Sequence, residues 1–311
     1  MNFYVAVTDN KWYHYLATLK PMPDEVNFWK PHSKTRLTTI QPGQPFLFKL
    51  KSPENAIAGG GFYLHYSVLP ISMAWDAFGD KNGADSLPGL VALIQEHEAE
   101  VDSEYSIGCM VLNSPFFFDK KDWIPTPSDF SLSNQQGQYY DTSNKSGRQL
   151  WSKVESLLLE RKGMAAENQE VYISDIPGGY GAAYLAKARL GQGGFKTLLL
   201  DLYQRRCAIT GERTTPVLEA AHIKPFKDHG PHNPQNGLLL RADVHILFDA
   251  GYITVTPQLR VEVSHRLKGD FDNGKDYRKY HGKNLLTVPL QELVRPSREF
   301  LEWHNAIRYK G

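Results

Sequence analysis

Residues 218–225 read LEAAHIKP, a short apolar run that ends in the imidazole of His222 and is stopped by a proline. A lone histidine in such a place is most often a core or turn residue. Here a polar loop at 224–235 follows, then NGLLL at 236–240 and ADVHILFDA at 242–250. The pattern predicts a strand over 217–223, a second strand over NGLLL and a helix that ends at Gly251. Such a unit can bring the end of the first strand against the helix face that carries His245.

The three polar side chains of this unit, His222, Asn236 and His245, are spaced by 14 and then 9 residues. Together with the strings CAITG, EAAHI, NGLLL and HILFDAG, and with RLGQGGF upstream, they resemble the HNH (ββα-metal) nuclease family. The resemblance implies that His222 is the general base, that Asn236 orients it or braces the loop, and that His245 ligates a divalent metal, Mg²⁺ or Mn²⁺. Phosphodiester hydrolysis suits these residue types, because neutral imidazole can accept a proton from water and a cation offsets phosphate charge.

One position departs from the family pattern, in which an acidic metal ligand often stands immediately before the base. That position is Ala221 in this chain. Glu219, two residues earlier on the same face of the predicted strand, can in principle reach inward, although a surface or structural carboxylate is the interpretation we favour. A decayed nuclease site, and hence a non-cleaving reader of nucleic acid, is therefore an alternative.

Cysteine usage argues against a structural zinc cluster. Only Cys109 and Cys207 are present, and Thr210 stands where a Cys-x-x-Cys pair would place its second thiol, so no Cys₄ site can form in one chain. Cys207 is expected to be a small buried apolar residue. Further histidines of this half are expected to be solvated or to contact phosphate: His229, His232, His265 and His281.

The front half predicts a different fold. Residues 1–125 contain β-branched and aromatic runs separated by Gly, Pro, Asn and Asp, with one helical pattern at 86–101, which favours a barrel-like β domain. We expect an α+β protein with a recognition domain at 1–160, a linker at 161–190 and a nuclease domain at 191–311. A helix is also expected over 151–162, after an irregular stretch at 126–150.

Tryptophans mark a candidate binding pocket in this front half. Trp29, in the otherwise polar EVNFWKPHSK, and Trp75, beside a Gly-containing loop, stand in unusual places for core residues, and Trp12 is a third candidate. The order of elements, with NFWKP, PGQPFLFKL and AIAGGGFYLHYSV, is similar to the EVE domain of the PUA superfamily. That resemblance implies a β-barrel whose pocket holds a flipped base between aromatic side chains.

EVE-like and HNH parts in one chain resemble the bacterial modification-dependent restriction endonucleases. The implied function is cleavage of double-stranded DNA near 5-methyl- or 5-hydroxymethylcytosine. An HNH endonuclease with another specificity, for sequence, structure or damage, is the alternative enzyme. Because a single HNH site cuts one strand, a double-strand break favours two copies acting as a homodimer.

Charge and composition fit this interpretation without deciding it. Residues 191–311 carry 18 Lys and Arg against 13 Asp and Glu, whereas the first 190 residues carry 17 against 21, so the basic half suits a polyanion. No apolar run is long enough for a membrane span, and no signal peptide is recognisable at the N-terminus. With two cysteines only, we expect a cytoplasmic protein.

Overall fold

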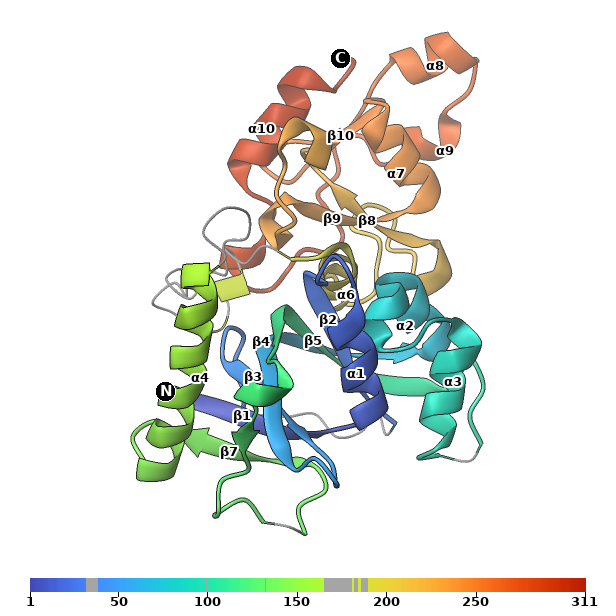
Figure 1. The fold of residues 1–311 in the computed structure, drawn as a ribbon. Coiled ribbons are helices and arrows are strands. Elements are labelled where there is room, and N and C mark those ends of the chain that lie inside the picture. The colour runs from blue at the N-terminus through green and yellow to red at the C-terminus, as the bar shows by residue number, and fades with distance from the viewer. Residues whose placement is uncertain (32–38, 99, 132, 165–180, 182–183, 186–189) are drawn as a thin grey trace. The chain divides into compact units, whose positions relative to one another are not determined.

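The computed structural model describes residues 1–31, 39–98, 100–131, 133–164, 181, 184–185 and 190–311. The chain divides into two compact units, Met1–Tyr184 and Leu185–Gly311, called here the N-terminal and C-terminal units (Figure 1). Most of the expected linker at 161–190 lies outside the described residues.

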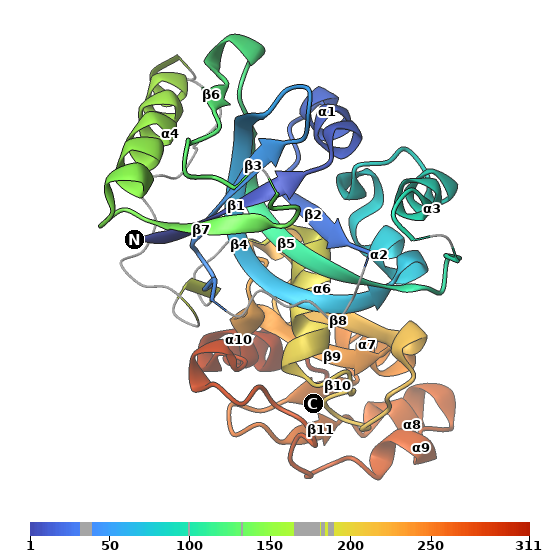
Figure 2. The same cartoon turned by 90° about the horizontal axis from the view of Figure 1, so that it is seen from below.

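The N-terminal unit is built on one mixed sheet with the strand order β2-β5-β4-β3-β1-β7 (Figure 2). Strands β1 and β3 are parallel, and the other pairs are antiparallel, including the short β6 against β4. The strands are β1 (Asn2–Thr8), β2 (Glu25–Lys30), β3 (Pro45–Leu50), β4 (Ala56–Pro70), β5 (Ser106–Phe117), β6 (Ile124–Pro125) and β7 (Gly137–Asp141).

This sheet is open in the described residues, with β2 and β7 at its two edges, and so differs from the barrel expected from the sequence. The residue patterns predict β1, β3, β4 and β5 correctly, but β2 was expected to be a polar loop and β7 lies in the stretch expected to be irregular. Closure of the sheet depends on which edges pair, and local patterns do not encode that pairing. The mixed α+β character is confirmed. Close approach between strands explains the glycine run in β4, because a β-carbon at Gly59 would lie 2.2 Å from the carbonyl oxygen of Phe116.

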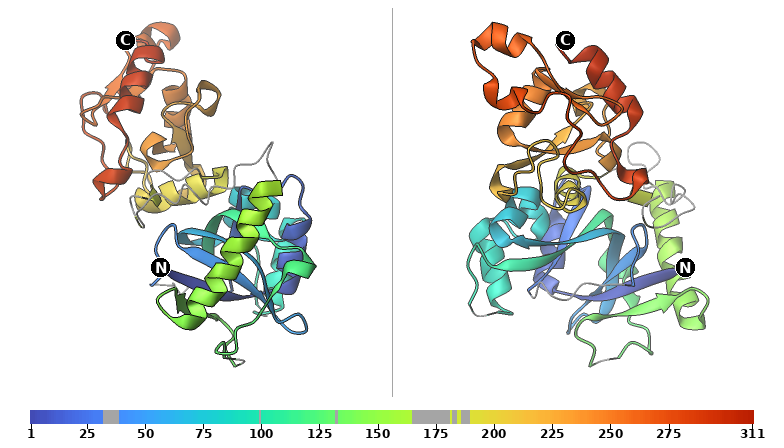
Figure 3. Two further views of the ribbon diagram at one scale, coloured as in Figure 1. Left: turned by 60° about the vertical axis from the view of Figure 1, so that its left-hand side comes forward. Right: turned by 180° about the vertical axis from the view of Figure 1, so that it is seen from behind.

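Helices cover this sheet at several places. Helix α4 lies across the strands (Figure 3), and its apolar side chains Leu150, Val154 and Leu158 join the core formed with β1 and β3. It begins six residues before the helix expected from the sequence. Helix α1 was not expected, although Asp9 supplies a recognisable N-cap by accepting from the amides of Lys11 and Trp12. The helices are α1 (Asn10–Thr18), α2 (Ile71–Phe78), α3 (Leu87–Gln95) and α4 (Lys145–Met164).

The C-terminal unit confirms the predicted strand, loop, strand and helix. Strand β8 (Leu218–His222) pairs antiparallel with β9 (Gly237–Arg241), so His222 lies opposite Gly237. Helix α7 (Ala242–Asp249) follows β9 directly. Helix α6 (Gln192–Leu202) contacts both strands, and its Phe195 and Leu199 are buried. The further elements are the hairpin β10 (Ile253–Val255) and β11 (Val261–Val263), α8 (Arg266–Phe271), α9 (Lys275–Arg278) and α10 (Arg298–Ile307).

Candidate active site

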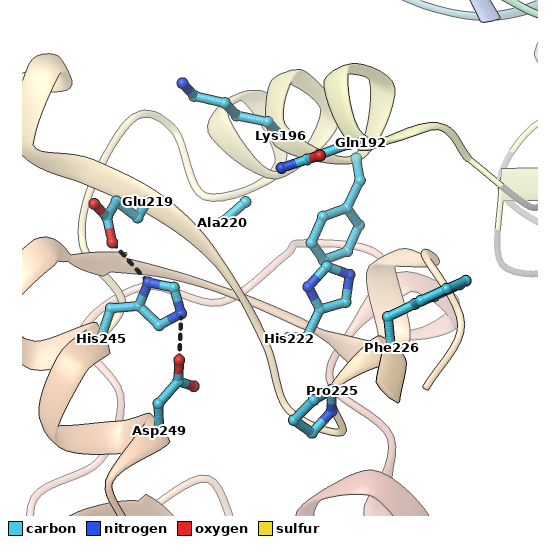
Figure 4. Close-up of a pocket in the computed structure, with 10 residues that line it drawn as sticks. Gln192, Lys196, Glu219, Ala220, His222, Pro225, Phe226, His245 and Asp249 are labelled. Atoms are coloured by element: carbon cyan, nitrogen blue, oxygen red, sulfur yellow. Dashed lines mark hydrogen bonds and ion pairs between the residues drawn. The ribbon is translucent and has the colours of Figure 1, made fainter. Parts of the chain in front are cut away.

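A cavity of about 400 Å³ opens between α6, β8, the loop after β8, and α7, all in the C-terminal unit. His222 and His245, two of the three residues predicted from the sequence, both line it (Figure 4). The complete lining is Gln192, Phe195, Lys196, Glu219, Ala220, His222, Pro225, Phe226, His245 and Asp249.

His222 is held at the end of β8 by ring contacts. The Phe195 ring stacks on it with centroids 4.2 Å apart and planes 16° from parallel. Its Nε2 lies 3.0 Å from Nδ1 of His232. Burial, together with the smaller effects of the nearby His232 and His245, lowers the pKa of His222 to about 4. The imidazole is therefore neutral near pH 7, as a proton acceptor must be.

His232 is the residue of this site that sequence analysis misplaced. It was expected to be solvated or to contact phosphate, whereas it is half-buried and contacts the ring of His222 at an angle of 85°. The polar loop around it is tightly closed, and this compactness brings His232 inward. A β-carbon at Gly230 would overlap the carbonyl oxygen of Lys224, at 1.7 Å. That glycine, immediately before Pro231 and His232, was the available signal.

Asn236 fastens the same loop from within. Its side chain is completely buried. Its Oδ1 accepts from the amide of Lys224 at 2.8 Å, and its Nδ2 donates to the carbonyl oxygens of Lys224 at 2.8 Å and Pro231 at 2.9 Å. The side-chain amide thus bonds to the backbone of the loop. The sequence left two roles open, orienting the base or bracing the loop, and these contacts correspond to bracing.

His245 lies between two carboxylates. Its Nδ1 is 2.7 Å from Oε2 of Glu219, and its Nε2 is 3.4 Å from Oδ2 of Asp249. Glu219 is an exposed side chain, as expected, and it also reaches the cavity, as the sequence allowed in principle. Ala221 is completely buried and does not line the cavity. Asp249 went unnoticed, although its i+4 spacing from His245 places both on one face of α7.

The donor chemistry around His245 suits a divalent cation. Carboxylate oxygen and imidazole nitrogen are ligand types that Mg²⁺ and Mn²⁺ accept. The two carboxylates flank opposite nitrogens of one ring, and the described residues contain no group of three or more His, Cys, Asp or Glu placed to hold a metal ion. Glu219 and His245 can supply two ligands, which leaves further positions for water and a DNA phosphate.

Both cysteines are buried, and neither forms a disulfide. In the C-terminal unit, Cys207 accepts hydrogen bonds through Sγ from the amides of Thr210 and Arg241, each at 3.3 Å. The thiol thus fastens the turn after α6 to the end of β9.

The N-terminal unit contains a second cavity, of about 670 Å³, lined by aromatic and basic side chains. Trp12 and Trp29 line it, whereas Trp75 lies half-buried on α2 and is not part of the lining. The lining is Val7, Asp9, Trp12, Phe28, Trp29, Lys30, Pro31, Lys49, Lys51, Ser52, Asn55, His97, Asn134, Gln135 and Gln136.

Trp29 lies on strand β2 and not in the polar loop expected for it. It is 8% exposed, and its Nε1 donates to the carbonyl oxygen of Asn82 at 3.0 Å. EVNFWK reads as polar, yet Glu25 and Asn27 are also buried. Asn27 donates to Oδ1 of Asn82 at 2.9 Å. A polar partner inside the unit thus allows a polar segment to form a buried strand.

Trp12 is a core residue with one edge on the same cavity. It is 3% exposed and packs edge-on against Phe28 and Phe48. Its Nε1 donates to the carbonyl oxygen of Asn27 at 3.2 Å. Both indole N–H groups are therefore used inside the protein, and what the two tryptophans offer a ligand is apolar ring surface.

Lys30 is the unusual polar group of this cavity. Its Nζ is buried, and no residue that the structure describes offers it a hydrogen-bond partner. Burial lowers the pKa of this amine. The other two lysines have partners, since Lys49 donates to Asn55 and Lys51 pairs with Asp9.

Comparison with known proteins identifies the C-terminal unit. Residues 207–256 match a family described as HNH endonuclease, and this range contains His222, Asn236 and His245. The chain therefore carries an HNH endonuclease domain and is a DNA-cleaving nuclease. No curated protein matches the chain.

One solved structure is described as "Modification dependent TagI restriction endonuclease". It is similar at a TM-score of 0.28 and 13% sequence identity, over 99% of this chain and 81% of that chain.

In the part of the chain that the structure describes, no helix has the length and apolarity needed to cross a membrane.

Proposed function

We propose that the protein is a modification-dependent DNA endonuclease. Its EVE-like N-terminal unit binds a flipped 5-methyl- or 5-hydroxymethylcytosine, and its HNH domain hydrolyses a nearby phosphodiester bond. The observation that carries the nuclease part is a half-buried, neutral His222 on one cavity with the Glu219–His245 pair. The setting we propose is the bacterial cytoplasm, where the two cysteines stay reduced.

In this mechanism His222 is the general base. It accepts a proton from water while the water oxygen bonds to phosphorus. The bond from phosphorus to O3′ then breaks, and O3′ takes a proton from solvent. The products are a 5′-phosphate and a 3′-hydroxyl.

The other residues of the cavity hold the reactants. Glu219 and His245 would hold a divalent metal, which supplies positive charge against the phosphate and the leaving oxygen. Lys196, on the cavity wall, contacts phosphate as a point charge. Asn236 keeps the loop after β8 closed.

Base recognition is assigned to the cavity of the N-terminal unit. The apolar ring surfaces of Trp12 and Trp29 that border this cavity contact the flipped base. Stacking of a base on an aromatic ring is worth about 1–3 kcal/mol per base. Lys30 supplies a hydrogen-bond donor that has no other partner among the described residues. A buried amine without a partner is unfavourable, so an acceptor oxygen on the ligand would stabilise it.

The deciding experiment is digestion of matched duplexes that carry cytosine, 5-methylcytosine or 5-hydroxymethylcytosine at one site, with Mg²⁺ or Mn²⁺. Cleavage of a modified duplex in preference to the unmodified one is expected. Equal cleavage of all three would instead identify an HNH endonuclease with another specificity. Binding without metal-dependent cleavage of any duplex would identify a non-cleaving reader.

Strand counting on the same gels tests the assembly. One HNH site cuts one strand, so we propose that double-strand cleavage is performed by two copies acting as a homodimer. Nicks at low protein concentration that become double-strand breaks as concentration rises would support this assembly. A constant ratio of nicks to breaks across concentrations would contradict it.

A further inference from the structure

We propose that His232 is a positioning residue for His222. In this arrangement Nε2–H of His222 donates to Nδ1 of His232, so that Nδ1 of His222 is left to accept the proton of the attacking water. The inference rests on the role of His222 proposed above and adds a residue to which sequence reasoning gave no part.

The assignment follows from counting protons on the ring of His222, which must be neutral to act as a base. A neutral imidazole has one N–H and one lone pair. The 3.0 Å contact between Nε2 of His222 and Nδ1 of His232 needs one donor and one acceptor. If His232 were the donor, His222 would carry its own proton on Nδ1 and would have no lone pair for water. Only donation by His222 leaves it a base.

The placement of the two nitrogens agrees with this assignment. Figure 4 shows one ring nitrogen of His222 on the side of His245 and the other on the side of Phe226. The His232 ring lies against Phe226, with centroids 5.1 Å apart, so Nε2 is the nitrogen on that side. Nδ1 therefore faces His245 and the cavity.

His232 is itself held firmly enough to orient a neighbour. The Phe195 ring that stacks on His222 also meets His232 edge-on, with centroids 5.8 Å apart. The carbonyl oxygen of His232 accepts from the amide of Leu190 at 3.0 Å, and Asn236 holds the preceding carbonyl, that of Pro231. Ring and backbone are thus fixed on both sides of the contact.

The same contact responds to the chemistry. When Nδ1 of His222 takes the proton from water, the ring becomes an imidazolium, and its Nε2–H bond to His232 becomes charge-assisted and stronger. His232 keeps its own proton on Nε2 throughout. No proton passes to it, so its part is to fix the tautomer and orientation of the base.

Two substitutions separate positioning from mere packing. His232→Phe keeps an aromatic ring but removes the acceptor, whereas His232→Asn places an amide oxygen near the position of Nδ1. His229→Asn is the matched control, because His229 lies in the same loop but takes no part in the described hydrogen bond and ring contacts of His222. The four full-length proteins are compared in single-turnover cleavage of one DNA duplex and in binding to it.

We expect His232→Phe to lower the cleavage rate on the order of 10²-fold with DNA affinity little changed, since general-base catalysis typically contributes 10²–10⁴-fold. His232→Asn should restore most of the rate, and His229→Asn should match the wild type. An unchanged rate in His232→Phe would overturn the inference. So would equal losses in the Phe and Asn variants, because the acceptor would then be irrelevant.

A spectroscopic measurement is independent of activity. Nitrogen-15 NMR of histidine-labelled full-length protein should show His222 protonated on Nε2 in the wild type and in His232→Asn, and a mixture of tautomers in His232→Phe. A wild-type His222 protonated on Nδ1 would refute the assignment. His222→Ala marks the separate failure: if that variant cleaves at full rate, His222 is not the general base, and the role on which this inference rests is wrong.

Discussion

Two histidines of the C-terminal unit each stack on a phenylalanine ring but differ in what their ring nitrogens contact. His222 stacks on Phe195, and His304 stacks on Phe248 with centroids 3.8 Å apart and planes 12° from parallel. Burial lowers the pKa of each to about 4. His304, however, uses both nitrogens inside the fold: Nδ1 pairs with Thr254 Oγ1 at 2.7 Å, and Nε2 donates to the carbonyl oxygen of Phe248 at 3.1 Å.

The contrast shows that burial and a lowered pKa do not by themselves identify a histidine as a catalytic residue. His304 has the perturbed pKa of an active-site residue, yet it is 2% exposed and fastens α10 to β10 and α7. His222 has one nitrogen on His232 and the other facing a cavity with a carboxylate–imidazole pair. Access to a cavity is what separates the two.

The largest expected effect comes from removing His222. His222→Ala should lower the cleavage rate by about 10²–10⁴-fold, the usual contribution of a general base, while leaving DNA binding in place. The measurement is single-turnover cleavage with a parallel binding assay. His304→Gln is the comparison, and it should cleave normally at a temperature where it is folded. Full activity of His222→Ala would erase the distinction between the two histidines.

The complementary effect is on stability. His304→Ala removes a stacked ring and leaves Thr254 and the Phe248 carbonyl without their partner, and we expect a loss of about 2–4 kcal/mol in the free energy of unfolding. Denaturant unfolding of the full-length variants measures it. His222→Ala should cost clearly less, because part of its ring borders a cavity. Equal losses would mean that His222 is as structural as His304.

A third prediction concerns the partners of His245. Glu219→Gln should raise the Mn²⁺ or Mg²⁺ concentration needed for half-maximal cleavage by about 10-fold or more, because it removes one anionic ligand. Asp249→Asn, on the other nitrogen of His245, should have the smaller effect. Metal titrations of cleavage by both variants provide the test, and the reverse order would assign the metal to the Asp249 side.

Lowering the pH should destabilise the folded chain through both histidines, His222 and His304. The unfolded chain takes up protons on histidine below pH 6.5, whereas the folded chain keeps His222 and His304 neutral until their pKa of about 4. Stability from these groups is therefore complete above pH 6.5 and falls as pH drops from 6.5 toward 4. Melting temperatures measured across this window should decline, and His304→Gln should decline less steeply. Equal slopes would contradict the pKa of His304.

The smallest effect is expected in the N-terminal unit, where a buried lysine without a described partner contrasts with a lysine that is paired. Lys30 has a pKa lowered by burial and no described partner, whereas Lys81 is paired with Asp24 and Glu25. Lys30→Met should reduce binding to 5-hydroxymethylcytosine DNA by about 5-fold, the net value of one ordinary hydrogen bond of about 1 kcal/mol. Lys81→Met should not change it.

Binding to unmodified DNA is the reference in that measurement. If Lys30→Met weakens binding to modified and unmodified duplexes equally, Lys30 contacts phosphate, and the preference lies elsewhere. Trp29 is less useful for this purpose than its sequence context indicated. Its burial and its hydrogen bond to Asn82 mean that Trp29→Ala would disturb the fold together with the cavity.

The sequence by itself determined the nuclease unit. LEAAHIKP, NGLLL and ADVHILFDA are short segments whose apolar patterns and stop signals are local, so their strands and helix, and the placing of His222 and His245 on one cavity, follow from chain order. Unlike β2 and β7, the strands β1, β3, β4 and β5 of the front half were also predictable from their residue patterns. Closure of its sheet was not, because edge pairing is a long-range property.

Only the tertiary structure decided which polar groups work together. Glu219 and Asp249 flank His245, and His232 meets His222, because β8, α7 and a tightly closed loop meet in space. The same holds for Trp29, whose polar neighbours suggested a loop until Asn82 supplied the partner that lets β2 be buried. A side chain's hydrogen-bond partners come from distant segments, and local sequence carries little information about them.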